Sequence, residues 1–377
     1  MPWKESTPMS SRLEFVLLAA QPGVNLAALC RRFEISRKTA YKWLERFRQE
    51  GQDGLQDQTR RPHTSPRTSP PELDALVLSL HVQYPCWGPR KLAALLPQSI
   101  KPHHSTIDAI LRRHGCRVVG APIKESIPVQ RFEHVAPNLL WQMDFKGHFA
   151  LTDIQAGRCH PLTILDDHSR FGLCLMACGD QRGSTVRQAM TTTFERYGLP
   201  ERITADNGAP WGTSGRGGLS QLETWLIRLG IRIGHSRPYH PQTQGKDERF
   251  HRTLKLELLA RRGFNSLAEC QREFDTWRER YNLVRPHEAL GQQPPISRYR
   301  PSGRALPSVL PEVEYDTRHP VRKVGAKGYI SYHSTLHFIG EGLRNELVAV
   351  APTATDGVFD VYFCHHRIRS IDARKSG

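Results

Sequence analysis

The sequence predicts a central α/β core with a mixed five-stranded sheet, preceded by all-α domains and followed by a small all-β, barrel-like domain. Capped helical patterns fill the first third of the chain, and short apolar runs alternate with amphipathic helices between residues 138 and 300. Strand-like runs separated by glycine-containing turns follow residue 301. Because 377 residues are too many for one ordinary hydrophobic core, several domains are expected.

Changes in composition and periodicity divide the chain into six segments. We predict a helix-turn-helix domain, a linker rich in proline and arginine, a second helical domain, a connector, the α/β core and the C-terminal β domain. In this order they span residues 1–55, 56–70, 71–117, 118–137, 138–300 and 301–377. The linker lacks apolar periodicity and is expected to be extended, with arginines that either follow a DNA backbone or are simply solvated.

The balance of charge indicates the kind of partner. Lys and Arg total 53 and Asp and Glu total 37, so the formal charge is +16. This excess favours a polyanion, and nucleic acid is the first candidate. The chain has no apolar run that would span a bilayer and no signal-peptide pattern at its start, so we expect no membrane and a place in the cytoplasm or nucleoid. Eight scattered cysteines without a Cys-x-x-Cys pair do not predict a zinc site.

The first helical domain has the pattern of a helix-turn-helix. Three helices are expected, over residues 12–20, 26–33 and 37–49. Asn25 and Ser36 are suited to cap the second and third of them. The N-terminal half of the third helix points four donors outward, where a recognition helix meets base edges and phosphates. These predicted DNA-binding residues are Arg37, Lys38, Tyr41 and Lys42. The alternative is a plain three-helix bundle with a solvated basic face.

A second helical unit follows the linker. Its three helices are expected over residues 73–81, 90–96 and 106–114. Pro89 suits the first position of the middle helix, and Ser105 is predicted to cap the third. Basic residues of this unit are Arg90, Lys91, Arg112 and Arg113. Two such units in tandem would recognise a longer DNA site than one.

The α/β core is predicted from its order of strands and helices. Strands are expected over residues 138–149, 161–166, 171–178, 202–205 and 231–233. Helices are expected over residues 184–197 and 219–229, and a further helix begins after Gly245. Residues 166–170 resemble a hairpin turn. In such a mixed sheet, the first and fourth strands can lie side by side at the centre.

Three carboxylates fall where this sheet would gather them. Asp144 lies on the first strand, Asp206 follows the fourth, and Glu248 lies in the first turn of the helix after Gly245. Three gathered acids raise one another's pKa, and divalent cations such as Mg²⁺ remove that penalty. Two ions about 3.5–4 Å apart can activate the attacking oxygen and stabilise the leaving one. A plainer interpretation makes Asp206 a turn residue and Glu248 a surface acid favoured by the helix dipole.

The helix after Gly245 has an apolar stripe and a charged face. Leucine and phenylalanine at a spacing of four residues predict the buried stripe, made of Phe250, Leu254 and Leu258. At 100° per residue, Arg252 and Lys255 share the opposite face with Glu248, and we expect these two cations to hold a DNA backbone. The residues of this segment predicted to bind DNA are Lys246, Arg249, Arg252 and Lys255.

Three linked segments resemble bacterial insertion-sequence transposases with a retroviral-integrase-like core. They are Trp-Gln-Met-Asp ending at Asp144, Asp-Asn-Gly beginning at Asp206, and Pro-Gln-Thr-Gln-Gly-Lys-Asp-Glu-Arg-Phe containing Glu248. Arg170 and the segment 281–287 fit flanking motifs of that family. The resemblance covers residues 139–295, and the tandem helix-turn-helix units agree with it.

The resemblance implies an RNase H-like fold and a catalytic, metal-binding triad of Asp144, Asp206 and Glu248 with two Mg²⁺ or Mn²⁺ ions. It implies DNA cleavage at element ends and transfer of the freed 3′-hydroxyl to target DNA, without a covalent enzyme intermediate. The expected partners are double-stranded DNA, as terminal inverted repeats and target, and further copies of the chain in a homo-oligomer on that DNA. The setting it implies is a bacterial nucleoid.

Two departures from the family pattern concern the third acid. Asp206 and Glu248 are 42 positions apart, a wider gap than in retroviral integrases. We assign the extra residues to a surface loop in the glycine-rich run 211–218. Asp247 is the second choice for the third ligand, because it lies beside Glu248 but 100° away around the helix.

Other functions and roles remain open at the level of sequence. One is a nonenzymatic DNA-binding repressor derived from a transposase, and another is a structure-specific nuclease of the RNase H-like fold. The C-terminal β domain is expected to bind DNA, to join subunits or to act as a stabilising cap. Its predicted strands span residues 322–331, 336–339, 346–350 and 358–365.

Overall fold

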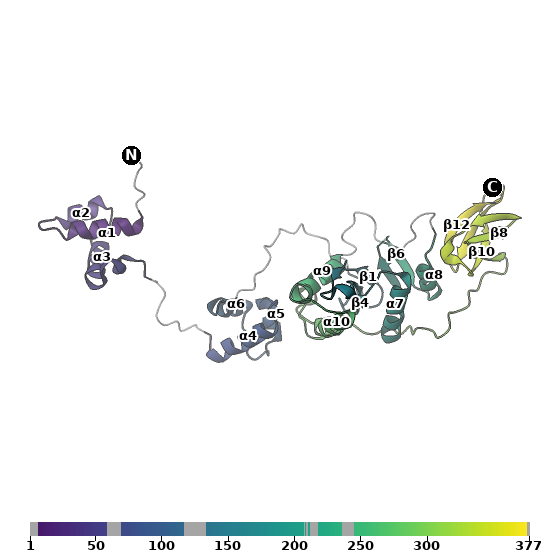
Figure 1. Cartoon of the computed structure of the whole chain (residues 1–377), viewed down its shortest axis with the longest axis horizontal. Coiled ribbons are helices and arrows are strands. Elements are labelled where there is room, and N and C mark those ends of the chain that lie inside the picture. The colour runs from purple at the N-terminus through teal and green to yellow at the C-terminus, as the bar shows by residue number, and fades with distance from the viewer. Residues whose placement is uncertain are drawn as a thin grey trace. The chain divides into compact units, whose positions relative to one another are not determined.

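The computed structural model describes residues 7–58, 69–116, 133–206, 208, 210–211, 218–235 and 245–374. These residues fall into two compact units, within 1–68 and 69–377, and Figure 1 gives the order of their elements. The expectations for most of the linker and connector, for the glycine-rich loop and for residues 236–244 lie outside the described residues. No helix in the described part of the chain has the length and apolar character needed to cross a membrane.

The first unit is a three-helix bundle with both predicted caps. Its helices are α1 (Pro8–Ala19), α2 (Leu26–Arg32) and α3 (Arg37–Glu50), followed by the 3₁₀ turn η1 (Gly51–Leu55). Asn25 accepts hydrogen bonds from the backbone N–H groups that begin α2, and Ser36 accepts one from Thr39. Ala40 and Trp43 enter the core with residues of α1 and α2, so the opposite face of α3 remains exposed.

The second unit begins with three more helices. They are α4 (Pro71–Gln83), α5 (Pro89–Leu95) and α6 (His104–Arg113). The prediction that Ser105 caps α6 is wrong. The cap is His103, whose Nδ1 accepts from the backbone N–H of Ser105 at 3.4 Å, so the helix begins before Ser105. A histidine ring nitrogen can replace the usual hydroxyl or carboxylate acceptor of an N-cap, which the residue preferences do not anticipate.

The core contains a mixed sheet, as predicted, with β1 and β5 adjacent. Its strands are β1 (Trp141–Phe145), β2 (Phe149–Ala150), β3 (Arg158–Asp166), β4 (Gly172–Cys178), β5 (Arg202–Ala205) and β6 (Arg232–His235). The order is β2-β3-β1-β5-β6, with β4 on β3, and β1, β5 and β6 run parallel. The expected five strands become six, because Gly147 at φ 91° interrupts the run 138–149 and β2 then pairs with β3.

Helices cover the sheet in two groups. They are α7 (Gly183–Tyr197), α8 (Gln221–Arg228), α9 (Gly245–Leu254) with the π-helical turn η4 (Lys255–Leu259), and α10 (Leu267–Leu283). Trp141 and Met143 of β1 pack in one cluster with α7 and α8. Phe250 and Leu254 of α9 pack in another cluster with α10. Trp141 and Met143, two positions apart on β1, therefore face the same pair of helices.

The C-terminal segment is all-β, as predicted, and its strands form two sheets. Its strands are β7 (Val321–Lys323), β8 (Tyr329–Tyr332), β9 (Thr335–Phe338), β10 (Leu347–Pro352), β11 (Val358–Phe363) and β12 (His366–Asp372). The sheet orders are β12-β11-β10-β7 and β8-β9. The run 322–331 divides because Gly328 adopts φ 79° and turns the chain between β7 and β8. The last strand, β12, was not predicted.

Glu257 of η4 forms a buried polar junction in the second unit. Its carboxylate accepts from Trp277 Nε1 at 3.2 Å, from Arg285 Nε at 2.8 Å and from Trp87 Nε1 at 3.1 Å. The side chains of Glu257 and Arg285 are only 8% and 12% exposed, so loss of either partner leaves the other buried without its counter-charge.

We therefore expect Glu257→Ala to lower the free energy of unfolding by about 3–5 kcal/mol, because it strands a buried guanidinium and two indole N–H groups. Urea unfolding followed by tryptophan fluorescence measures the change. Glu288→Ala is the control, since this glutamate is 62% exposed and lies 3.5 Å from Arg90. It should cost less than about 1 kcal/mol. Equal losses in the two variants would contradict the assignment of Glu257 to a buried junction.

Candidate active site

The side chain of Asp144 lies on the α9 side of the sheet. Residues alternate along β1, so Trp141 and Met143 enter the cluster beneath α7 and α8. Asp144 faces the other way, with its Oδ2 3.9 Å from Nδ1 of His251 on α9. The carboxylate is 27% exposed, so solvent reaches it at the edge of the sheet.

Asp206 lies beside Asp144 because β5 runs parallel to β1. Gln142 is opposite Thr204 in the register, and continuing it by two residues brings Asp206 level with Asp144. Asp206 follows the last residue of β5. Parallel neighbours end at the same edge of a sheet, so this pairing explains why two acids 62 positions apart come together.

The three acids share one electrostatic environment. Burial raises the pKa of Asp144 to about 6, the negative charge of Asp206 adds to the rise, and Glu248 contributes further. Glu248 is exposed in the first turn of α9. The rise in pKa that the sequence predicted is thus present at Asp144.

Hard carboxylate oxygens under mutual repulsion suit Mg²⁺ or Mn²⁺, because a divalent cation relieves the repulsion. Asp144, Asp206 and Glu248 fit such an ion in chemistry. Among the residues that the structure describes, no three His, Cys, Asp or Glu side chains are arranged as a ready metal-binding group. Their role as a ligand set and as the catalytic triad remains a prediction.

Asp247, the second choice for the third ligand, is buried and differs in this from Glu248. It is 1% exposed, and neither carboxyl oxygen has a hydrogen-bond partner within the described residues. Burial, followed by the charges of Asp144 and Asp167, holds its pKa well above the ordinary value. Asp247 therefore lies on the buried side of α9, whereas Glu248 faces solvent.

His251 and Thr163 support Asp144 and were not predicted. The Thr163 hydroxyl donates to the backbone carbonyl of Asp144 at 3.0 Å, and its oxygen lies 2.8 Å from His251 Nε2. The Thr163 oxygen therefore connects the backbone of β1 at Asp144 to the His251 ring. Burial and the charge of Lys146 lower the pKa of His251 to about 4, so the ring is neutral. The available signal was a histidine three residues after Glu248, on a neighbouring part of the helix surface.

Lys246 anchors the start of α9. Asp167, in the turn after β3, is fully buried and pairs with the Lys246 ammonium. The same carboxylate accepts from Gln142 Nε2 at 2.8 Å and from the backbone N–H of His134 at 2.9 Å. The prediction that Lys246 binds DNA is not supported, because its side chain is 16% exposed and its charge is paired inside the protein. Neither Asp167 nor this anchor was predicted.

The other predicted DNA-binding residues are exposed. Arg37, Lys38, Tyr41 and Lys42 lie on the outer face of α3, and Arg249, Arg252 and Lys255 lie on the outer side of α9 and η4. The apolar stripe of Phe250, Leu254 and Leu258 is buried as predicted. Contact with DNA by the exposed residues stays a prediction.

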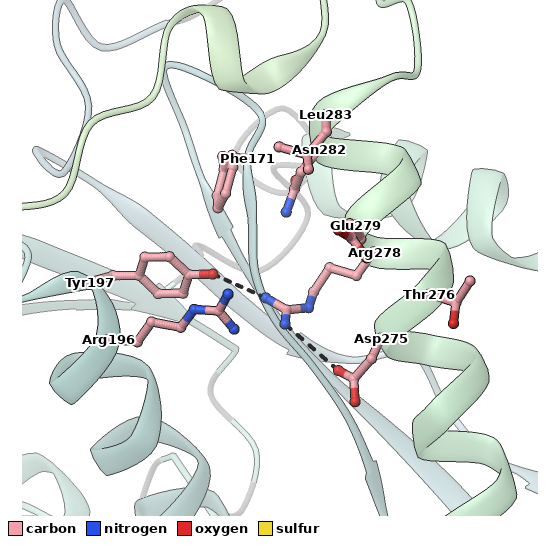
Figure 2. Close-up of a pocket in the computed structure, with 9 residues that line it drawn as sticks. All are labelled: Phe171, Arg196, Tyr197, Asp275, Thr276, Arg278, Glu279, Asn282 and Leu283. Atoms are coloured by element: carbon pink, nitrogen blue, oxygen red, sulfur yellow. Dashed lines mark hydrogen bonds and ion pairs between the residues drawn. The ribbon is translucent and has the colours of Figure 1, made fainter.

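A separate cavity of about 430 Å³ lies between the end of α7 and α10. Figure 2 shows Arg278 directed toward Tyr197 and Asp275, with its Nη1 donating to the Tyr197 hydroxyl at 3.2 Å. None of the three acids lines this cavity. It is therefore distinct from the edge of the sheet where the acids meet.

Comparison with protein families gives matches to the helical units, the core and the C-terminal segment. Two models described as integrase core domain match residues 134–241 and 229–295. A helix-turn-helix domain matches residues 11–63, and a homeodomain-like domain matches residues 39–111. The C-terminal domain of IS481 family transposases matches residues 319–377. The chain therefore combines segments that match helix-turn-helix domains, integrase core domains and the C-terminal domain of IS481 family transposases.

Relatives of this chain occur in insertion elements and endogenous viruses. The IS407 uncharacterized 31.7 kDa protein of Burkholderia multivorans is 26% identical over 55% of this chain and 74% of its own length. The IS476 uncharacterized 39.2 kDa protein of Xanthomonas euvesicatoria is 27% identical over 64% of this chain and 68% of its own. The Gag-Pol polyprotein of baboon endogenous virus is 27% identical over 45% of this chain and 10% of its own.

Solved retroviral structures also align with the chain. The simian T-cell lymphotropic virus intasome structure gives a TM-score of 0.38 at 16% identity, over 78% of this chain and 99% of that one. The HTLV-2 integrase catalytic core in complex with magnesium gives 0.34 at 13% identity, over 44% and 99%. Neither TM-score reaches 0.5, so the RNase H-like fold is assigned from the strand order and the family matches. Integrase-core families are polynucleotidyl transferases that use divalent metals, and helix-turn-helix domains imply DNA binding.

We expect Asp144→Asn to stabilise the metal-free protein at pH 8, because the folded state holds the Asp144 proton more tightly than the unfolded chain does. For a carboxyl whose folded pKa is raised to about 6, stabilisation by the bound proton is lost as pH rises through that value. The gain from Asn should therefore be about 1–2 kcal/mol larger at pH 8 than at pH 5. Urea unfolding at the two pH values in EDTA measures it, and a gain independent of pH would contradict the shared environment of the acids.

Proposed function

We propose that this chain is a DNA transposase that cleaves DNA at the ends of its own element and joins the freed 3′-hydroxyl to target DNA. The observation that supports this most directly is the parallel register of β1 and β5, which brings Asp144 and Asp206 level at one edge of the sheet in a segment that matches integrase core domains. Charge gathered at an exposed sheet edge is costly for folding, and a cation-dependent reaction on phosphodiesters accounts for it.

In this proposal Asp144, Asp206 and Glu248 hold two Mg²⁺ or Mn²⁺ ions. Such ions activate the attacking oxygen and stabilise the leaving oxygen of phosphodiester displacement. Neutral His251, with Thr163, orients Asp144 from behind, and the Asp167–Lys246 pair fixes the turn that carries Glu248. Arg249, Arg252 and Lys255 hold the DNA backbone beside these acids.

The proposed chemistry is a pair of displacements at phosphorus. In cleavage, the oxygen of water forms a bond to phosphorus as the bond to the 3′-oxygen breaks, which leaves a 3′-hydroxyl on the element end. In transfer, that 3′-oxygen attacks a target phosphorus and displaces the 3′-oxygen of the target strand, with its own proton released. One phosphodiester is exchanged for another, so the joining step needs no external energy source.

Recognition of the element ends is assigned to the N-terminal helical units. The exposed donors of α3, which include Arg37 and Lys42, would meet base edges and phosphates of a terminal inverted repeat. Transposition needs two ends held together, so we propose a homo-oligomer assembled on DNA. A repressor would keep only this recognition, and a nuclease would cut without joining.

The proposal is tested by strand transfer with Mg²⁺ on DNA taken from the flanks of the gene. Glu248→Gln should reduce joined product at least about a hundredfold, because an amide cannot act as an anionic metal ligand. Glu279→Gln is the matched control, since Glu279 is exposed on α10, and it should retain wild-type product. Equal product from Glu248→Gln and the wild type would end the catalytic assignment.

Labelled 3′-hydroxyl ends separate the two alternatives. Hydrolysis without joined product would favour the nuclease, and specific DNA binding with neither reaction would favour the repressor.

A second experiment tests recognition by α3. Combined Arg37→Ala and Lys42→Ala substitutions should weaken binding to the flanking DNA and reduce the slope of log K against log salt by about 2, if each cation contacts one phosphate. Arg48→Ala is the control on the same helix, because its guanidinium already pairs with Glu45 at 2.8 Å. Fluorescence anisotropy at several salt concentrations measures both, and an unchanged affinity and slope would remove α3 from the DNA interface.

A further inference from the structure

A second cavity, of about 380 Å³, lies between the segment that joins β1 to β2 and the turn η4 that follows α9. Its charged lining residues include Lys146 and Lys255, and its apolar walls include Phe149 and Phe264. Lys146 was not among the residues predicted to bind DNA, and no role has been assigned to the cavity. We call it the Lys146 cavity.

Two uncompensated cations meet in the Lys146 cavity. Lys146 follows β1 and Lys255 belongs to η4, and both residues line the same cavity. Neither lysine forms an ion pair within the described part of the chain. Arg262 also lines the cavity, but it pairs with Glu269 at 2.6 Å and with Glu273 at 2.7 Å. The charge available to a ligand is therefore that of the two lysines.

The Lys146 cavity lies close to the three acids on the same side of the sheet. Lys146 follows Asp144 by two residues, and its backbone N–H continues the ladder by donating to Pro161 at 3.0 Å. Two residues of strand span about 6.6 Å. Lys255 follows Glu248 by seven residues, which on a helix is a rise of about 10.5 Å. At about 3.4 Å per nucleotide step, a DNA strand passing the acids reaches the cavity within one to three steps.

We propose that the Lys146 cavity is a subsite for one backbone phosphate of DNA, one to three nucleotides from the phosphate that reacts. This inference rests on the proposed function and names a part of its substrate that the acids do not contact. A phosphate anion between Lys146 and Lys255 removes their repulsion, as a divalent cation does for the acids. The two lysine ammonium groups can each donate a charge-assisted hydrogen bond to such a phosphate. The phosphate belongs either to the element end or to the target DNA.

Binding of DNA with a single neutral methylphosphonate, measured in EDTA, tests the subsite without any catalysis. The methylphosphonate is moved through each position near the reacting phosphate, first in the element-end duplex and then in a target duplex. Wild-type protein should lose affinity about tenfold at one position in one of the two duplexes. The Lys146→Gln variant should bind unmodified DNA about tenfold more weakly than the wild type does. A methylphosphonate at the sensitive position should then weaken its binding no further. The duplex that shows the effect identifies the source of the phosphate.

The control variants separate a specific subsite from general loss of charge. Lys146→Arg should keep most of the affinity and the position effect, which shows that the fold is intact. Arg262→Gln should change affinity evenly at all positions, because that guanidinium is already paired. The inference is overturned if Lys146→Gln responds to methylphosphonate as the wild type does at every position.

Outcomes for the subsite and for the proposed function remain distinguishable. If no methylphosphonate position matters but strand transfer still depends on Glu248, the subsite is rejected and the proposed function stands. If one methylphosphonate position matters only when Lys146 is present, but the protein never joins strands, the transposase proposal is rejected and the phosphate subsite stands.

Discussion

Repulsion among carboxylates at one edge of the sheet is the constraint around which the core is built. The parallel pairing of β1 with β5 brings Asp206 level with Asp144, where burial and then the charge of Asp206 raise the pKa of Asp144. The hydrophobic clusters on the two faces of the sheet hold this arrangement against the repulsion. A fold that maintains such a concentration of charge is suited to bind a cation and a polyanion together, which is the requirement of phosphodiester chemistry.

Helix α9 connects that charge to the rest of the core because its surfaces have different roles. Phe250 and Leu254 are buried against α10, whereas Glu248 is exposed to solvent. The buried pair of Lys246 and Asp167 determines where the helix begins, and so where Glu248 lies. Rigid elements with locked neighbours hold functional side chains more accurately than loops do. The position of the third acid thus depends on a turn at the far end of β3.

Local patterns were sufficient to predict most elements of this chain. The caps Asn25 and Ser36 and the apolar stripe of α9 follow from residue preference and from the helical period, which act over a few residues. The errors arose where one residue has two possible roles. His103 replaces a hydroxyl as a cap, and Gly147 divides one apparent strand into two, because backbone conformation and ring acceptors do not alter the hydrophobic pattern.

The sequence by itself determined the order of the acids, the basic excess, the helix-turn-helix pattern and the exposed face of α9, because each depends on composition or on a backbone period. Only the tertiary structure decided which partner each polar side chain has. It pairs Lys246 with the buried Asp167 and places His251 and Thr163 beside Asp144. It also brings Lys146 and Lys255, which are more than a hundred positions apart, to the lining of one cavity. Such pairs depend on which strands are neighbours and where a helix crosses them, and no local spacing carries that information.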